Sequence, residues 1–181
     1  MPLSDDNKYP GDNKDEKRNG YGKVISSEGH MYVGFWKDDE MHGEGTLTIP
    51  DDFRFTGEFK DGDFIQGELI YPDCSKYIGE FKNNKYHGEG TFIYTDGTKD
   101  VGHWKDGNKH GRVISNYPNG GLLNAHWVNN VCEGPGTLIY PDGSMYVGEF
   151  KNGKRDGHGS FTFPDGRKHV GEWVNDKYKS E

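Results

Sequence analysis

The stretch YVGEFKNGKRDGHG, residues 146–159, decides the fold of this chain. In its first six residues, period-two alternation places residues 146, 148 and 150 on one face of a strand and residues 147, 149 and 151 on the other. Gly153 follows, a residue type that tolerates positive φ in a tight hairpin turn. The Gly-x-Gly at residues 157–159 then opens a second strand, so the stretch predicts one β-hairpin.

The same pattern recurs along nearly the whole chain. Units begin at Tyr32, Phe55, Tyr77, Asp100, Leu123, Tyr146 and His169, with spacings of 23, 22, 23, 23, 23 and 23 residues. A fixed period of this size is typical of stacked repeat architectures. We therefore predict an all-β fold, an elongated single-layer array of stacked antiparallel β-hairpins with the form of a solenoid-like, twisted trough, built from about seven 23-residue repeats.

The repeat boundaries also predict the organisation of the chain. Residues 1–18 are predicted to be a disordered polar N-terminal tail, residues 19–176 the repeat array, and residues 177–181 a C-terminal tail. Within the array, residues 19–31 form a half-repeat before the first unit, and residues 169–176 form a terminal half-unit. Connecting turns such as Pro141-Asp142-Gly143 carry the chain from one unit to the next.

A large aromatic residue occupies the fifth position of every unit, and a glycine or alanine stands two residues before it. We predict that the rings pack against the backbone of these small residues. Because a single layer leaves part of its face uncovered, ring edges are expected to line a groove for an extended or helical segment of a partner protein. The candidate groove residues are Tyr32, Trp36, Phe59, Tyr77, Phe81, Trp104, Trp127, Tyr146, Phe150 and Trp173.

A column of lysines follows the aromatic column. Its members are Lys37, Lys60, Lys82, Lys105 and Lys151. Stacked repeats bring these side chains into one row, which suits inositol phosphates, an acidic partner or, with the neighbouring glutamates, a solvated charge ladder. The first of these interpretations makes the column a candidate site for anionic lipid headgroups.

Composition excludes several classes of function. The chain has 181 residues, 30% of them hydrophobic, and a formal net charge of −8, which disfavours non-specific nucleic-acid binding. Cys74 and Cys132 lie far apart without metal-ligand spacing, and residues 1–18 contain no apolar export segment. We expect free thiols, an intracellular location, and neither a metal nor a cofactor.

Comparison among the units argues against catalysis. His42, His87 and His110 recur just before the first glycine of the second strand, but the equivalent positions hold Gln66, Glu133 and Asp156, so this slot requires a polar residue near a turn. The glutamates of the first strand, Glu58, Glu80, Glu149 and Glu172, are replaced elsewhere by Phe35, His103 and His126. No constellation of acid and base persists, and we predict a protein that is not an enzyme.

Residues 146–159, and equally residues 77–90, resemble the MORN (membrane occupation and recognition nexus) repeat. The resemblance implies elongated β-hairpin arrays that act as scaffolds in cilia, cell-division structures and membrane junctions, with protein contact the commoner role and phosphoinositide binding also proposed. Three units depart from the pattern: the second lacks the second glycine (Gly67-Glu68-Leu69), the fourth reads Gly111-Arg112-Val113, and the fifth has Leu123, Ala125 and His126. We expect the array to bend at the second and fourth units.

These observations predict a non-enzymatic scaffold that binds protein partners through an aromatic groove, in a cytoskeletal, ciliary or cortical assembly of the cytoplasm. The alternative is a peripheral phosphoinositide-binding or anionic-membrane-binding module that uses the lysine column. Terminal strands have unpaired backbone groups, which makes end-to-end homodimerisation a further hypothesis.

Overall fold

The computed structural model of the chain describes residues 13–180. Over this range every regular element is a β-strand, and neighbouring strands are antiparallel and follow sequence order. The prediction of an all-β fold made of successive hairpins is confirmed. The chain divides into two compact units, residues 1–87 (unit 1) and residues 88–181 (unit 2).

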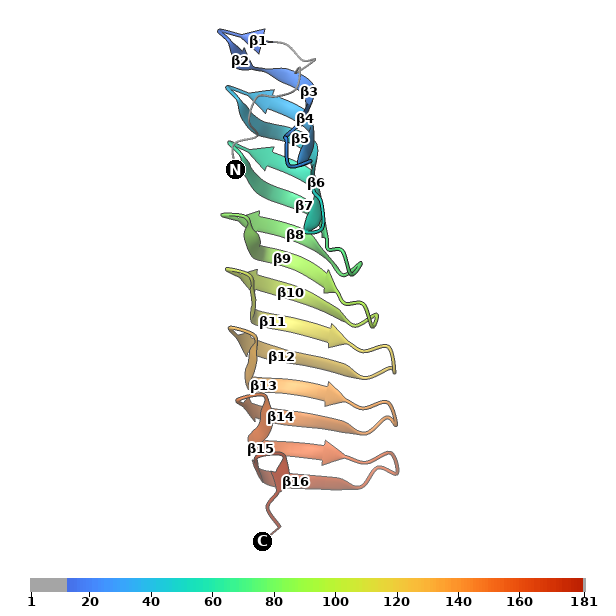
Figure 1. The fold of residues 1–181 in the computed structure, drawn as a ribbon. Helices are drawn as coiled ribbons and strands as arrows, with labels where there is room; N and C mark the ends of the chain where they lie inside the picture. The colour runs from blue at the N-terminus through green and yellow to red at the C-terminus, as the bar shows by residue number, and fades with distance from the viewer. Residues whose placement is uncertain (1–12, 181) are drawn as a thin grey trace. The chain divides into compact units, whose positions relative to one another are not determined.

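In unit 1 the hairpins pair strand by strand along the chain (Figure 1). Its strands are β1 (Asn13–Lys14), β2 (Lys17–Arg18), β3 (Gly20–Ile25), β4 (Met31–Lys37), β5 (Glu40–Ile49), β6 (Phe53–Lys60), β7 (Asp63–Ile70) and β8 (Lys76–Lys82). The next strand, β9 (Lys85–Ile93), begins in unit 1 and ends in unit 2.

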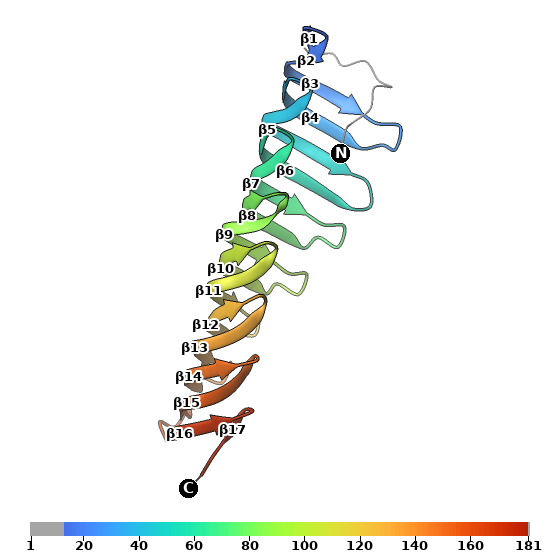
Figure 2. The same ribbon diagram turned by 90° about the vertical axis from the view of Figure 1, so that its left-hand side faces the viewer.

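Unit 2 repeats the same arrangement. Its further strands are β10 (Lys99–Lys105), β11 (Asn108–Asn116), β12 (Leu122–Val128), β13 (Val131–Ile139), β14 (Met145–Lys151), β15 (Lys154–Thr162), β16 (Lys168–Val174) and β17 (Lys177–Tyr178). Figure 2 shows that the strands within each unit curve rather than lie flat. In each unit, one face of the curved strands therefore encloses side chains, and we call this face the aromatic face. The opposite face of the same strands is called the outer face.

Each hairpin turn contains two consecutive residues with positive φ. Asn152 and Gly153, for example, have φ of 51° and 75°, and Asn129 and Asn130 have φ of 49° and 67°. Two positive φ values give the backbone twist that matches paired strands. The prediction that these positions hold residues tolerant of positive φ is confirmed.

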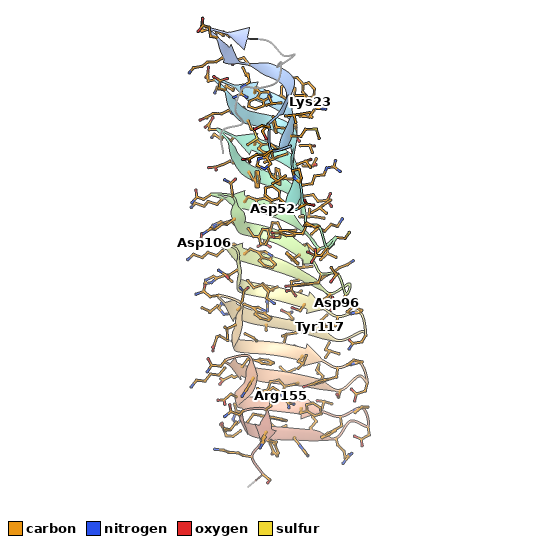
Figure 3. All side chains as sticks on the ribbon, in the orientation of Figure 1. Lys23, Asp52, Asp96, Asp106, Tyr117 and Arg155 are labelled. Atoms are coloured by element: carbon orange, nitrogen blue, oxygen red, sulfur yellow. The ribbon has the colours of Figure 1, made fainter. Side chains whose placement is uncertain are left out.

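The connecting turns form at the opposite ends of the strands, as Asp96 and Asp106 mark in Figure 3. In these turns an aspartate accepts hydrogen bonds from the residue two positions later: Asp142 Oδ1 lies 2.9 Å from Ser144 N and 2.6 Å from Ser144 Oγ. These bonds, the hydroxyl first, hold the pKa of Asp142 below its usual range. The Asx-Gly signal in the sequence therefore has a direct physical role.

Both predicted tails are shorter than expected. Residues 13–18 form the β1–β2 hairpin, in which Asn13 pairs with Arg18, and residues 1–12 of the predicted tail lie outside the described residues. At the other end, Trp173 pairs with Tyr178, so β16 and β17 complete a short seventh hairpin beyond residue 176. Charge and polarity suggested a tail in both places, whereas β1 and β2 form a separate two-stranded sheet and β17 pairs with β16 at the edge of the main sheet.

The register corrects one assignment of the second repeat. Gly67 pairs with Gly57 and Gly79, as Gly45 pairs with Gly34 and Gly57, so Gly67 is the second glycine of its pair and the first is the one missing. The spacing of 22 residues to Tyr77 reflects this one-residue deletion at the bulge after the turn. No helix long and apolar enough to span a membrane occurs among residues 13–180.

Candidate protein-binding surface

The ten aromatic residues proposed for a groove are all buried. Their relative exposures lie between 0% for Tyr32 and 8% for Trp127. The prediction that their ring edges remain accessible is therefore wrong, and these residues form the core of each unit. A partner cannot reach them without disrupting the fold.

Tight packing on glycine explains part of this burial. A Cβ atom at Gly34 or Gly45 would stand only 2.4 or 2.3 Å from the Tyr32 hydroxyl, which donates a hydrogen bond of 2.9 Å to the Phe35 carbonyl. The Tyr32 ring also meets Trp36 and Phe59 edge to face, at centroid distances of 4.9 and 5.1 Å. Tyr32 thus lies on a glycine pair between two rings of the ladder, and Tyr146 does the same on Gly148 and Gly159.

A second set of residues closes the core, and sequence reasoning missed it. We call these the cover residues. All but the first stand across the hairpin from a fifth-position aromatic, as Lys109 pairs with Trp104 and Arg155 with Phe150, whereas the first, Arg18, pairs with Asn13. Several of their side chains lie over a ring of the following repeat, as Lys109 Nζ lies 3.7 Å from the Trp127 ring centre. Their residue type varies along the chain, as Arg18, Met41, Phe64, Tyr86, Lys109, Cys132, Arg155 and Tyr178, so only the spacing of one repeat could have revealed them.

The next hairpin turn holds the backbone of several cover residues. Asp176 Oδ1 accepts from Arg155 N at 2.9 Å, and Asp176 N donates to the Arg155 carbonyl at 2.9 Å. Asn130 makes the same pair of bonds to Lys109. These bonds fix Lys109 and Arg155 over the core. The repeat spacing in the sequence does not by itself indicate them.

The polar position just before the first glycine of the second strand caps a turn, which agrees with the structural role predicted for it. Glu133 Oε1 accepts from Asn152 N at 2.9 Å, and Asp156 Oδ2 accepts from Asn175 N at 3.0 Å. His42 lies in the same slot, with Nδ1 3.4 Å from Asp61 Oδ1. Gln66 does not belong to this slot, because its register partners are Glu58 and Glu80.

An apolar hollow of about 460 Å³ lies on the aromatic face of unit 1. Its walls are Met41, Leu47, Ile49, Phe53, Phe64, Leu69 and Tyr71, with His30, Asp52, Gly62 and Asn84 beside them. Leu47, Phe64 and Leu69 are buried, whereas Met41, Ile49 and Phe53 are half-buried and reach the surface. Met41 and Ile49 of β5 and Phe53 of β6, not the aromatic ladder, therefore form the accessible apolar surface.

Unit 2 has a row of rings at the corresponding position, at the end of each second strand. Tyr94 and Tyr117 are 37% and 38% exposed, and Tyr140 and Phe163 are half-buried. Figure 3 labels Tyr117. The sequence signal is a ring placed before proline, as in Tyr117-Pro118, Tyr140-Pro141 and Phe163-Pro164. The prediction of partly exposed rings was thus attached to the wrong column.

The fourth repeat contains a buried polar cluster. Asp100, which is 2% exposed, accepts hydrogen bonds from Tyr94 Oη at 2.8 Å, Lys109 Nζ at 2.9 Å and Ser115 Oγ at 2.5 Å. Burial, and then the bond to Asp100, raise the pKa of Tyr94. The carboxylate is fully bonded, so it has a structural role in this repeat rather than that of a catalytic acid or base.

The five lysines of the candidate headgroup column are all exposed. Lys37, Lys60 and Lys82 belong to unit 1, and Lys105 and Lys151 to unit 2. Each precedes a hairpin turn, and acidic residues such as Asp38, Asp61 and Asp106 follow three of them. The column is therefore accessible but lies beside negative charge.

The two cysteines are unpaired and differ in environment. Cys74 is exposed in a connecting turn, whereas Cys132 is 3% exposed and its burial raises the pKa of the thiol to about 11. Among residues 13–180 no group of three or more His, Cys, Asp or Glu side chains is arranged to hold a metal ion.

Successive antiparallel hairpins of one repeating length, each with a buried aromatic residue at its fifth position, define a β-hairpin repeat protein. The MORN repeat pattern matches residues 32–53, 77–99, 101–121, 125–145 and 146–166. The chain belongs to the MORN repeat family, which is a non-enzymatic repeat family.

Solved structures of low sequence identity are also similar to this chain. One is the TCP domain of Drosophila melanogaster SAS-4 in complex with a proline-rich motif of Ana2 (13% identity, 94% of this chain and 86% of that chain, TM-score 0.48). Others are the TCP10c domain of Drosophila melanogaster Sas-4 (14%, 85% and 93%, TM-score 0.49) and the TCP10 domain of Danio rerio CPAP (20%, 85% and 90%, TM-score 0.25). No curated protein sequence matches the chain significantly.

Proposed function

We propose that this chain is a non-enzymatic scaffold that binds an apolar segment of a partner protein on its aromatic face. The observation that supports the proposal is the hollow of about 460 Å³ in unit 1, which has apolar walls and opens to solvent. The half-buried rims of Met41, Ile49 and Phe53 provide contact area, because an incoming aliphatic or aromatic side chain removes them from water.

The polar residues beside the hollow suit a peptide backbone. His30 and Asp52 stand at its margin and carry donors and acceptors that a partner's main chain can use. An apolar centre with a polar margin is the usual composition of a protein interface. From the MORN repeats we also propose a place in a cytoskeletal, ciliary or cortical assembly of the cytoplasm.

Substitutions at the mouth of the hollow test this function. Ile49→Lys and Phe53→Lys place charges where the partner's apolar side chain would enter, and both positions are half-buried, so the sheet should tolerate them. We expect partners cross-linked to the wild-type chain to be lost from both variants.

Arg54→Glu is the matched control, because Arg54 is exposed and follows Phe53 in the same strand, on the outer face. Folding of all variants is checked by thermal denaturation. If folded Ile49→Lys and Phe53→Lys chains retain every partner that Arg54→Glu retains, the hollow is not the binding site.

A second function, attachment to anionic membranes, rests on the exposure of all five column lysines. Co-sedimentation of the full chain with vesicles that contain or lack phosphoinositide tests it. Headgroup-dependent binding that persists at physiological salt and disappears in a Lys60→Glu/Lys82→Glu variant supports this function. Equal sedimentation with both vesicles, or none, argues against it.

A further inference from the structure

The outer face of unit 1 exposes a pair of aromatic rings that the core does not use. Tyr21 and Phe35 are 60% and 47% exposed and meet edge to face with centroids 5.3 Å apart. They are direct register partners on β3 and β4. Phe35 stands where the other repeats have glutamate or histidine, as at Glu58 and His103. The fold therefore accepts a polar residue here, and the rings need another explanation.

Two carboxylates lie beside these rings. Phe35 lies over Gly43 of β5, where an added Cβ atom would be 3.5 Å from the Phe35 Cβ. The next residue, Glu44, is the direct register partner of Glu58 on β6. Like charges directly opposite each other on one face of a sheet are destabilising. Neither glutamate forms an ion pair or a side-chain hydrogen bond with a residue in the described part of the chain.

The same row in unit 2 is arranged differently. There Glu89 lies 3.3 Å from His103 Nδ1, and Glu172 lies 3.0 Å from His158 Nδ1. On the outer face of unit 1, Lys37 follows Phe35 by two residues and Lys60 follows Glu58 by two residues. Neither lysine forms an ion pair with Glu44 or Glu58. The carboxylates of Glu44 and Glu58 thus remain available for a cation supplied by another molecule.

The chain itself shows which cation combines with a ring and a carboxylate. Arg18 lies 4.1 Å from the Trp36 ring centre while its Nε is 2.9 Å from Asp39 Oδ1. Arg155 lies 4.5 Å from the Trp173 ring centre while its Nε is 3.2 Å from Asp176 Oδ1. On the outer face of unit 1, the rings of Tyr21 and Phe35 and the carboxylates of Glu44 and Glu58 form no cation–π contact or ion pair with a guanidinium of the described residues.

We propose that Tyr21, Phe35, Glu44 and Glu58 form a docking site for an arginine-bearing, extended segment of a partner protein. The planar guanidinium stacks on an exposed ring, and its N–H groups reach the carboxylates in a bidentate arrangement. The four residues lie on four successive strands, β3 to β6, which span about 14 Å. That length accommodates two arginines at alternate positions of an extended peptide. The site is on the face opposite the hollow and does not depend on it.

A peptide titration of the full chain tests the proposal. The probe is acetyl-Gly-Arg-Gly-Arg-Gly-amide, and the comparison peptides carry lysine or citrulline in place of arginine. Binding is followed by amide NMR shifts at physiological salt. We expect shifts centred on residues 21, 35, 44 and 58, the tightest binding for arginine, and none for citrulline, which keeps the shape but loses the charge. Equal binding of the lysine and arginine peptides, or any comparable binding of citrulline, would overturn it.

Two variants separate the ring from the charge. Phe35→Gln removes the ring without a change of charge and introduces a residue type already present in the same row at Gln66. Glu58→Gln removes one charge and keeps the shape. Each should weaken binding of the arginine peptide about fivefold, the size of one exposed cation–π contact or ion pair.

Glu149→Gln is the matched control, because Glu149 lies in the same row of unit 2 opposite Pro135 rather than beside an exposed ring. It should leave the affinity unchanged. Unaltered affinity in both Phe35→Gln and Glu58→Gln, or an equal loss in Glu149→Gln, contradicts the assignment.

Discussion

The sixth and fourth repeats, both in unit 2, fill the same core position in two ways. In the sixth, Tyr146 is completely buried and its hydroxyl donates to the Glu149 carbonyl at 3.0 Å. The hydroxyl lies on the register pair Gly148 and Gly159, where a Cβ atom would stand 2.4 or 2.3 Å away. In the fourth repeat an aspartate, Asp100, replaces the tyrosine.

With the smaller side chain, the second glycine of the pair becomes a valine. Val113 pairs with Gly102 and is completely buried, so its side chain occupies part of the space that a tyrosine ring takes elsewhere. Lys109 and Ser115 bond the Asp100 carboxylate and compensate its burial. Both repeats therefore fill the same volume on the aromatic face of the strands. The tyrosine and the glycine pair beneath it change together.

The largest effect is expected when the sixth repeat receives the valine of the fourth without its aspartate. In Gly159→Val the new Cβ would lie 2.3 Å from the Tyr146 hydroxyl and 2.5 Å from its ring. Because the backbone of Gly148 closes the other side, the ring must leave its position, and we expect a loss of at least about 3 kcal/mol in the free energy of unfolding. Urea denaturation measures this loss.

Ser160→Val is the control for that variant, because Ser160 neighbours residue 159 on the outer face of the same strand. It should change stability little. A Gly159→Val chain as stable as Ser160→Val would show that the tyrosine position is not tightly filled.

The converse exchange introduces the tyrosine and the glycine of the sixth repeat into the fourth. Asp100→Tyr should clash with Val113, and Val113→Gly should leave a cavity, so each alone is destabilising. The double variant restores the arrangement of the sixth repeat at both positions. We expect it to be more stable than the sum of the single effects by about 2 kcal/mol, measured as a double-mutant cycle in urea. Strict additivity would mean that the two positions do not share a volume.

Much of this architecture followed from the sequence, because hairpin turns and glycine pairs recur at fixed intervals and each has a local physical cause. Asn152 and Gly153 predict their turn without knowledge of any distant residue. Burial of the rings could not be predicted in the same way, since it depends on cover residues such as Lys109 and Arg155, which differ in type and act on the following repeat. The candidate groove was therefore assigned to the core.

The register of the second repeat also escaped sequence reasoning. Gly67-Glu68-Leu69 was aligned to the first glycine, because nothing local shows that a residue has been deleted at the bulge. Pairing to Gly57 and Gly79 on both neighbouring strands reveals it. The predicted bends at the second and fourth repeats, and the role of the lysine column in binding anionic headgroups, stay predictions.

A smaller effect should follow from removing the charge of the fourth repeat's cluster. Asp100→Asn keeps the shape but leaves Lys109, which is only 14% exposed, without its anionic partner. We expect a loss of about 1.5 kcal/mol. Asp100→Asn/Lys109→Met should recover part of it, because no unpaired charge then remains. Failure of the second substitution to restore any stability in urea denaturation would show that the ion pair is not what compensates the missing tyrosine.

The smallest effect concerns the connecting turns that precede the two repeats, and it depends on pH. The Ser144 hydroxyl is the main cause of the lowered pKa of Asp142 before the sixth repeat, whereas the Thr98 backbone N–H is the main cause at Asp96 before the fourth. A carboxyl whose pKa is lower in the folded than in the unfolded chain stabilises the fold above the unfolded pKa, about 4, and this contribution disappears as pH falls through the folded pKa.

Ser144→Ala should therefore be less stable than wild type at neutral pH, and the difference should close in acid. Thr98→Val should show a smaller difference of the same sign. Thermal unfolding between pH 2 and pH 7 measures both, and a Ser144→Ala difference that is independent of pH would mean that the hydroxyl does not act through the carboxylate.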